Sequence, residues 1–144
     1  WQTEKQQSQE LLRADFARDH PLRILVAEDN PVNQQLIAHI LGRLGYEPAM
    51  TGNGLEAIEA LRNNLYDMIL MDVHMPEMDG LEATRQIRSE FSWQPTIVAL
   101  TANAMQGDEE ECREAGMDDY LSKPIRLEEL IGMLARWSLH RKAG

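Results

Sequence analysis

Five polar residues of this sequence follow short apolar segments, each at the point where its segment ends. Glu28 and Asp29 follow the first segment, and Asp72 ends a later one. Thr101 and Lys123 stand at the same place behind two further segments. Carboxylates bind hard cations, and an activated carboxylate can attack phosphorus, so this set could hold a metal and perform nucleophilic chemistry.

The charges of these residues predict a divalent cation. Glu28, Asp29 and Asp72 would bring three negative charges close together, which raises their pKa values and costs stability. Lys123 alone cannot neutralise three acids, whereas Lys123 together with a divalent ion can. Carboxylates without His or Cys partners favour a hard ion, and Mg²⁺ commonly binds through one or two carboxylates and several waters. The sequence therefore predicts a Mg²⁺ site, with Mn²⁺ as an alternative ion.

Asp72 is the candidate nucleophile of the set. A carboxylate beside Mg²⁺ and a lysine can attack phosphorus and form an aspartyl phosphate. Phosphoryl transfer needs in-line positioning and neutralisation of the equatorial oxygens. Lys123 and the Thr101 hydroxyl are expected to contact two of these oxygens, and the small Ala102 leaves access to the phosphorus.

Alternating apolar segments and helical patterns would position these residues. Continuous apolar runs are typical of strands that are buried on both faces. They predict five strands, at 23–27, 47–51, 66–72, 96–101 and 120–122. Each strand precedes a helical pattern, and such alternation builds a parallel sheet that binds ligands at the carboxyl ends of its strands. We therefore predict an α/β fold, a flavodoxin-like, doubly wound (βα)5 parallel sheet with strand order 2-1-3-4-5.

Helix signals lie between the predicted strands. Asn30 can cap the first helix and Pro31 suits its first turn, while Asp79 and Glu82 have capping-box spacing for the third helix. Apolar stripes at helical spacing are expected to face the core. These stripes comprise Val32, Leu36, Ile37, Ile40, Leu41 and Leu44 in the first helix, and Leu55, Ile58, Leu61 and Leu65 in the second.

A polar neighbouring face completes the first helix. Gln34, Gln35 and Ala38 are expected to be exposed there and to leave a flat surface beside the predicted site. A partner protein could dock on this helix and on the loops around Asp72.

Composition excludes several classes of function. The formal net charge of −10 argues against non-specific nucleic-acid binding, which needs clustered Lys and Arg. A single cysteine, Cys112, excludes an internal disulfide. No apolar run approaches the roughly 20 residues that span a bilayer, and the N-terminus has no apolar signal core. We expect no nucleic-acid partner, no direct membrane contact and a cytoplasmic location, within a parent protein that could itself be membrane-anchored.

The first residues differ in composition from the rest. Residues 1–21 are rich in Gln, Glu, Arg and Asp, and we interpret them as a linker or an N-terminal helical extension that His20-Pro21 would end. Residues 22–140 are expected to form the domain, and residues 141–144 a tail. Because the sequence begins without Met, we expect it to be part of a longer chain.

Four motifs together resemble the receiver domains of two-component signalling. They are Glu28-Asp29, the segment 71–80 (MDVHMPEMDG), Leu100-Thr101-Ala102 and Ser122-Lys123-Pro124. The resemblance covers about residues 22–138, and the order and spacing of the motifs make it specific. The segment 27–33 (AEDNPVN) is similar to that of receivers fused to hybrid sensor histidine kinases.

The resemblance implies a role for each acidic residue. Asp72 would accept a phosphoryl group from the phosphohistidine of a kinase or of a histidine phosphotransfer domain. Asp29, Asp72 and the backbone carbonyl of His74 would bind Mg²⁺, and Glu28 would act through metal-bound water. Such a module promotes its own phosphorylation and dephosphorylation without conventional turnover, which leaves its classification as an enzyme open.

The resemblance also implies a conformational switch. Thr101 and Tyr120 match a coupled pair in which the phosphoryl group draws Thr101 inward and Tyr120 rotates into the vacated space. The helix predicted at 104–115 has few apolar residues, so it is expected to be weakly held and able to respond.

Several alternatives remain open. The receiver of a hybrid sensor histidine kinase is our main interpretation, and a stand-alone single-domain response regulator is the nearest alternative. A haloacid-dehalogenase-like phosphatase would need a second Asp two residues after Asp72, where His74 stands. A flavodoxin-like electron carrier shares the topology, but the sequence has no evident phosphate loop.

Overall fold

The computed structural model describes residues 15–102 and 106–143. Helices and strands alternate along them after a short first helix. The elements are α2 (Phe16–Asp19), β1 (Ile24–Ala27), α3 (Pro31–Arg43), β2 (Ala49–Thr51), α4 (Gly54–Asn63), β3 (Met68–Asp72), α5 (Gly80–Glu90), β4 (Thr96–Thr101), α6 (Gln106–Ala115), β5 (Asp119–Ser122) and α7 (Leu127–Ala143). No helix within these ranges combines the length and the apolar character needed to cross a bilayer.

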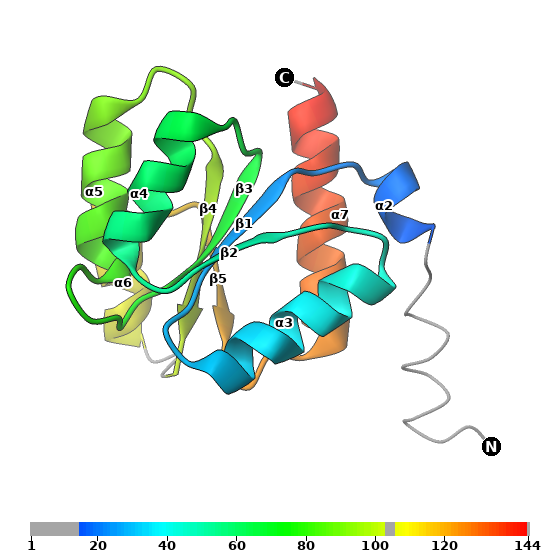
Figure 1. Cartoon of the computed structure of the whole chain (residues 1–144), viewed down its shortest axis with the longest axis horizontal. Helices are drawn as coiled ribbons and strands as arrows, with labels where there is room; N and C mark the ends of the chain where they lie inside the picture. The colour runs from blue at the N-terminus through cyan, green and yellow to red at the C-terminus, as the bar shows by residue number, and fades with distance from the viewer. Residues whose placement is uncertain (1–14, 103–105, 144) are drawn as a thin grey trace.

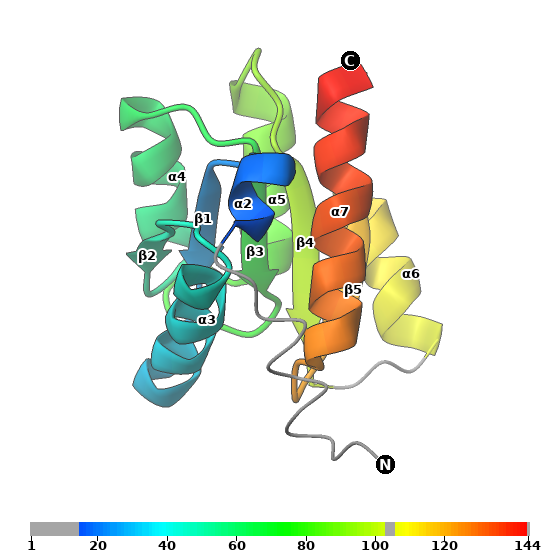
Figure 2. The same cartoon turned by 90° about the vertical axis from the view of Figure 1, so that its right-hand side faces the viewer.

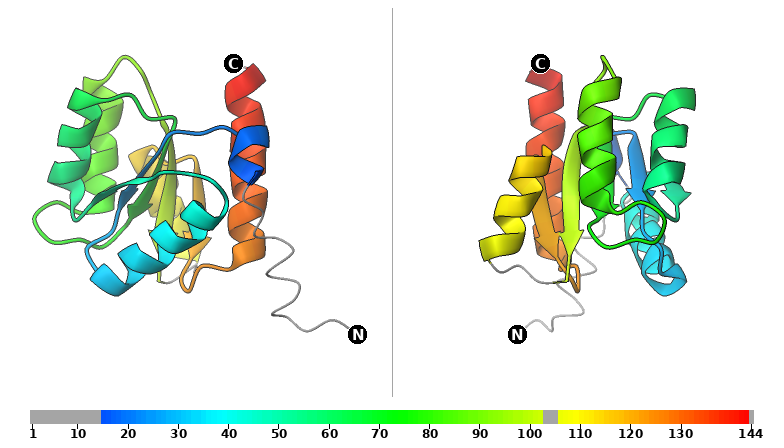
Figure 3. Two further views of the ribbon diagram at one scale, coloured as in Figure 1. Left: turned by 45° about the vertical axis from the view of Figure 1, so that its right-hand side comes forward. Right: turned by 90° about the vertical axis from the view of Figure 1, so that its left-hand side faces the viewer.

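The strands form one parallel five-stranded sheet in the order β2-β1-β3-β4-β5. This confirms the predicted flavodoxin-like (βα)5 topology. Helices α3 and α7 cover one face of the sheet, and α4, α5 and α6 cover the other (Figures 1 and 3).

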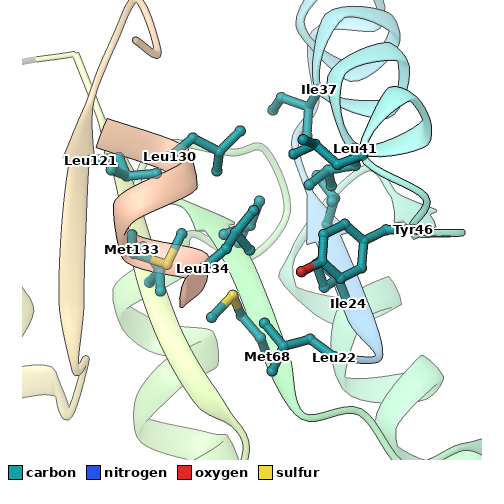
Figure 4. Packing of buried hydrophobic residues seen from close by; sticks show 14 of the residues in the cluster. Leu22, Ile24, Ile37, Leu41, Tyr46, Met68, Leu121, Leu130, Met133 and Leu134 are labelled. Carbon is teal, nitrogen blue, oxygen red and sulfur yellow. The ribbon is translucent and has the colours of Figure 1, made fainter. Parts of the chain in front are cut away.

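Alternate residues of each central strand enter two different cores. In β1, Ile24 and Val26 belong to the core beneath α3 and α7, whereas Leu25 and Ala27 belong to the core beneath α4, α5 and α6. Figure 4 shows the first core, to which both Leu41 of α3 and Leu134 of α7 contribute. Burying one such leucine contributes about 1.5–3 kcal/mol, which explains why these strands are apolar on both faces.

Two of the predicted apolar stripes are too wide. Val32 and Leu36 of α3 are 72% and 47% exposed, and Leu55 and Leu65 are 47% and 56% exposed. Successive helix residues turn by about 100°, so Val32 and Leu36 point about 140° and 100° away from the buried Ile37. Leu65 lies beyond the end of α4 at Asn63. These four side chains therefore face solvent rather than the core.

The helix starts agree with the sequence. The Asn30 side chain accepts hydrogen bonds from the backbone N–H groups of Val32 and Asn33, with Pro31 in the first turn. Asp79 accepts one from the backbone N–H of Glu82. Each cap fixes the end of the loop that precedes its helix. The loop before α3 contains Glu28 and Asp29, and the loop before α5 follows Asp72.

Residues 15–21 lie against α3 and α7. The Ala17 N–H donates to the Leu44 carbonyl at 2.9 Å, and the Tyr46 hydroxyl donates to the His20 carbonyl at 2.6 Å. His20 Nδ1 lies 3.0 Å from the Oγ of Ser138 in α7, and Figure 2 shows α2 beside that helix. Residues 1–14 of the predicted linker or extension, and Gly144 of the predicted tail, lie outside the described residues.

Candidate functional site

Three carboxylates meet at the carboxyl edge of the sheet. One carboxylate oxygen from each of Glu28, Asp29 and Asp72 lies within 4.8 Å of the others. Glu28 and Asp72 are 0% and 4% exposed, whereas Asp29 is open to solvent. The neighbouring parallel strands β1 and β3 end side by side, which brings these acids together as the sequence predicted.

Lys123 reaches the two buried acids from the end of β5. Its Nζ lies 2.9 Å from Asp72 Oδ2 and 2.9 Å from Glu28 Oε2. Its backbone N–H donates to the Thr101 carbonyl at 2.7 Å, which ties the lysine to the end of β4. The Lys123-Pro124 peptide bond is cis.

The two oxygens of Glu28 have different surroundings. Oε1 accepts from the Asn30 N–H at 3.2 Å and from Asn33 Nδ2 at 3.4 Å. Oε2 is buried and faces the Lys123 ammonium at 2.9 Å. Three carboxylates and one ammonium leave the site with an excess of negative charge. A hard cation would balance that charge, and the all-oxygen donor set fits Mg²⁺.

The pKa values of the two buried acids are shifted in opposite directions. Burial and, to a smaller extent, the Glu28 charge raise the pKa of Asp72 to about 6 against the opposing effect of Lys123. Burial also acts to raise the pKa of Glu28, but the Lys123 ammonium and the Asn30 N–H outweigh it and hold that pKa below its ordinary value. The two carboxylates in turn raise the pKa of Lys123 against its own burial. Glu28 is thus the stronger acid of the pair, and a bound cation would lower the pKa of Asp72.

Cation affinity is therefore expected to fall below about pH 6. A proton on Asp72, whose pKa is about 6, competes with the ion for the same oxygens. One competing proton predicts about tenfold weaker Mg²⁺ binding at about pH 5 than at about pH 7.5. Isothermal titration calorimetry at both pH values measures the difference, and equal affinities would contradict the raised pKa.

The stability of the metal-free protein should change with pH in the opposite direction to the cation affinity, and should be higher at low pH. The pKa of Asp72 is higher in the folded protein than in the unfolded chain, so protonation of Asp72 favours the folded state. This stabilisation is complete below the ordinary pKa of an aspartate and is lost as the pH rises through about 6. Mg²⁺ should consequently raise the melting temperature more at about pH 7.5 than at about pH 5.

Thr101 and Tyr120 lie on one face of the sheet. Thr101 is buried at the end of β4. Alternate residues of a strand share one face, so Thr101 lies on the same face as Ile97 and Ala99, which belong to the core beneath α4, α5 and α6. Tyr120 pairs in register with Ala99 and packs, half-buried, against the same core. The structure thus places both residues of the expected switch on the side covered by α6.

His74 has only its backbone in the site. Its N–H donates to Asp72 Oδ1 at 3.2 Å, while its side chain is exposed.

Sequence reasoning missed two residues that shape the site. A Cβ on Gly80 would lie 2.2 Å from the Asp72 carbonyl oxygen, so only glycine allows the loop after β3 to close against the acid. Gln34 and Ala38 were expected to be exposed, but both are half-buried, and the Gln34 side chain donates to the Glu28 carbonyl. The signal for Gln34 was its place in the first turns of the helix that follows the acidic pair.

Comparisons with known proteins agree on one family. The family model of the response regulator receiver domain matches residues 24–135. The chain is 39% identical over 112 residues to the polar-differentiation response regulator DivK of Brucella anthropi, covering 77% of this chain and 91% of that protein. Other relatives are histidine kinases from Candida albicans, Dictyostelium discoideum, Salmonella and rice, at 38–43% identity. The chain spans only 4–15% of their length.

Solved structures are similar as well. The receiver domain of the sensor histidine kinase PA1611 from Pseudomonas aeruginosa, with a magnesium ion in its active site cleft, is 47% identical with a TM-score of 0.75. The match covers 81% of this chain and 97% of that one. The receiver domain of Ssk1 from Saccharomyces cerevisiae, crystallised with the histidine phosphotransfer protein Ypd1, is 31% identical with a TM-score of 0.77, covering 83% and 90%.

The matched segment contains every strand of the sheet and all the acids of the site. The chain therefore belongs to the family of response regulator receiver domains, the phospho-relay modules of two-component signalling.

Proposed function

We propose that Asp72 accepts a phosphoryl group from a phosphohistidine on a partner protein. The observation that carries this proposal is the placement of Asp72 between an acidic pair and Lys123, with a raised pKa that a bound cation would lower. A carboxylate so placed is ionised when the cation is bound and remains the nucleophile of the set.

The transfer uses few groups of the protein. An Asp72 carboxylate oxygen attacks the phosphorus, the phosphorus–nitrogen bond of the phosphohistidine breaks, and its electron pair returns to the imidazole. Lys123, already 2.9 Å from Asp72, is placed to bind one oxygen of the transferred group. A Mg²⁺ or Mn²⁺ ion bound by Asp29, Asp72 and the His74 carbonyl, with Glu28 acting through water, would neutralise charge on that group.

The response to phosphorylation would pass through the sheet face that α6 covers. The Thr101 hydroxyl is proposed to bind the acyl phosphate, and Tyr120 to rotate as Thr101 moves. Tyr120 is only half-buried, so its ring has space to change its packing beside Cys112 and Met117 of the same core. The ligand can shift this equilibrium only by the contacts that differ between the two states.

We propose that the partner docks on α3. Val32 and Leu36 expose apolar side chains on this helix, beside the buried acids. Leu36 also lines a groove of about 320 Å³, together with Glu28, Lys123, Pro124 and Ile125. An apolar surface next to the nucleophile suits a helical histidine phosphotransfer domain, the kind of protein that occupies the Ssk1 receiver.

A pair of leucines tests this docking surface. Leu36→Glu should slow phosphorylation by a phosphorylated histidine phosphotransfer protein at least about tenfold, because it places a charge in the apolar contact. Leu55→Glu is the matched control, since Leu55 is also 47% exposed but lies on α4. Transfer of radiolabelled phosphate, followed with time, gives the rates.

A small phosphodonor separates docking from chemistry. Leu36→Glu should react with phosphoramidate at the parental rate in the presence of Mg²⁺. If the two glutamate variants react equally fast with the protein donor, α3 is not the docking surface; if the parent reacts with neither donor, the proposed function is wrong.

The context of the domain is also a proposal. The many histidine kinase relatives favour the receiver of a hybrid sensor histidine kinase. The near-complete overlap with DivK keeps the stand-alone response regulator as the alternative. Either context uses the same phosphoacceptor.

A further inference from the structure

The acidic turn after β1 is fastened to the sheet by a side chain. Beyond the end of β1 at Ala27, the Glu28 N–H still donates to the Thr51 carbonyl of β2, at 3.0 Å. The Gln34 Nε2 group then donates to the Glu28 carbonyl and, at 3.3 Å, to the same Thr51 carbonyl. Both acceptors are carbonyl oxygens, so the amide nitrogen of Gln34 must face them.

We propose that Gln34 is a positioning residue for the cation site. Its side-chain amide binds one carbonyl just past the end of β1 and one at the end of β2, and so holds the two chains together beyond their last backbone hydrogen bond. This contact would set the backbone direction of Glu28 and Asp29. This inference rests on the proposed function, because it concerns the same cation. It adds a residue that touches neither the cation nor the phosphoryl group.

Electrostatic repulsion is the reason that such a fastening is needed. Glu28, Asp29 and Asp72 lie within 4.8 Å of one another, and like charges at that distance repel. Lys123, 2.9 Å from Glu28 and Asp72, offsets part of this repulsion, but without a divalent ion the site still carries an excess of negative charge, and the turn at Glu28–Asp29 lies beyond the end of β1. A hydrogen bond from a helix to the turn opposes movement of the acids away from one another.

Helix α3 is a suitable support for this bond. Its N-terminus is capped by Asn30, and Asn33 donates to Glu28 Oε1 from the same first turn. Gln34 thus holds the backbone of Glu28 while its neighbours hold the carboxylate. The helix therefore presents the turn to the cation already in its binding geometry, which reduces the cost of ordering on binding.

Two adjacent glutamines provide the test. Gln34→Met keeps the length of the side chain and removes its donors, while Gln35→Met makes the same change at an exposed position of the same helix. We expect Gln34→Met to raise the dissociation constant for Mg²⁺ about tenfold, and Gln35→Met to leave it unchanged. Isothermal titration calorimetry with MgCl₂ on the whole chain measures both.

A stability measurement separates positioning from general support. Urea unfolding in EDTA reports the fold without metal, and a purely structural role would lower stability there while leaving the Mg²⁺ dissociation constant unchanged. Gln34→Asn, which keeps the amide but shortens its reach, should show the same loss of affinity and guards against a variant that folds poorly.

The possible outcomes separate the positioning role of Gln34 from the proposed function of the site. Parental Mg²⁺ affinity in both Gln34 variants would overturn the positioning role and leave the proposed function intact. Absence of Mg²⁺ binding by the parent would remove the proposed function, and the inference with it.

Discussion

Asp72→Asn is expected to acquire no acid-labile phosphate, whereas the parent acquires one per chain when Mg²⁺ and a small phosphodonor are present. The amide has no anionic oxygen to attack phosphorus, and Asp72 stands at the centre of the site with Lys123 2.9 Å away. Because the reaction passes through this one carboxylate, the loss should be complete rather than partial.

Phosphate incorporation, measured by mass spectrometry of the intact chain at neutral pH, gives the result. Asp79→Asn is the matched control, since asparagine can also cap α5 and the position lies in the neighbouring loop. Equal labelling of Asp72→Asn and Asp79→Asn would remove the assignment of the phosphoacceptor.

The same substitution should stabilise the metal-free fold. At about pH 7.5 the parent holds an ionised carboxylate whose pKa burial has raised to about 6, and a neutral amide avoids that cost. Removing it should raise the free energy of unfolding in EDTA by an amount on the order of 1 kcal/mol and abolish the extra stability conferred by Mg²⁺.

Lys123→Met is expected to slow phosphorylation by at least about a hundredfold while leaving some Mg²⁺ binding. The substitution keeps a side chain of similar length and removes the ammonium that contacts both Glu28 and Asp72. Lys123 lowers the pKa of Asp72, so that pKa should rise further in the variant and less of the nucleophile should be ionised at neutral pH.

Rates with phosphoramidate at several Mg²⁺ concentrations test this expectation. Arg126→Met is the control, because Arg126 is an exposed cation three residues further along the chain. A Lys123→Met protein that reacts as fast as the control at saturating Mg²⁺ would refute the role of the lysine.

The sequence predicted those parts of the site that depend on strand ends. Asp29, Asp72 and Lys123 could be placed because apolar runs mark the strands, and parallel strands end at one edge. Gln34 could not be placed, because whether its amide meets solvent or a carbonyl depends on how α3 lies across β1 and β2. Val32 and Leu36 were misassigned for a related reason, since apolar residue type does not reveal which part of a wide stripe the core can cover.

The hydrophobic pattern of the sequence also did not predict that Phe16 packs against the core beneath α3 and α7. A single aromatic residue in a polar stretch has no periodicity to read, and its burial depends on Tyr46 and His20, which contact it from outside its own helix.

The attachment of α2 has a mechanical consequence. The chain enters the domain at the amino end of β1, whereas Asp72 lies at the carboxyl edge of the sheet, so the two points are separated by the length of the strands. Tension applied through the preceding residues would be borne first by the contacts of Ala17 and His20 with Leu44, Tyr46 and Ser138. A pull or twist from upstream is therefore delivered to the ends of α3 and α7 that are remote from the nucleophile.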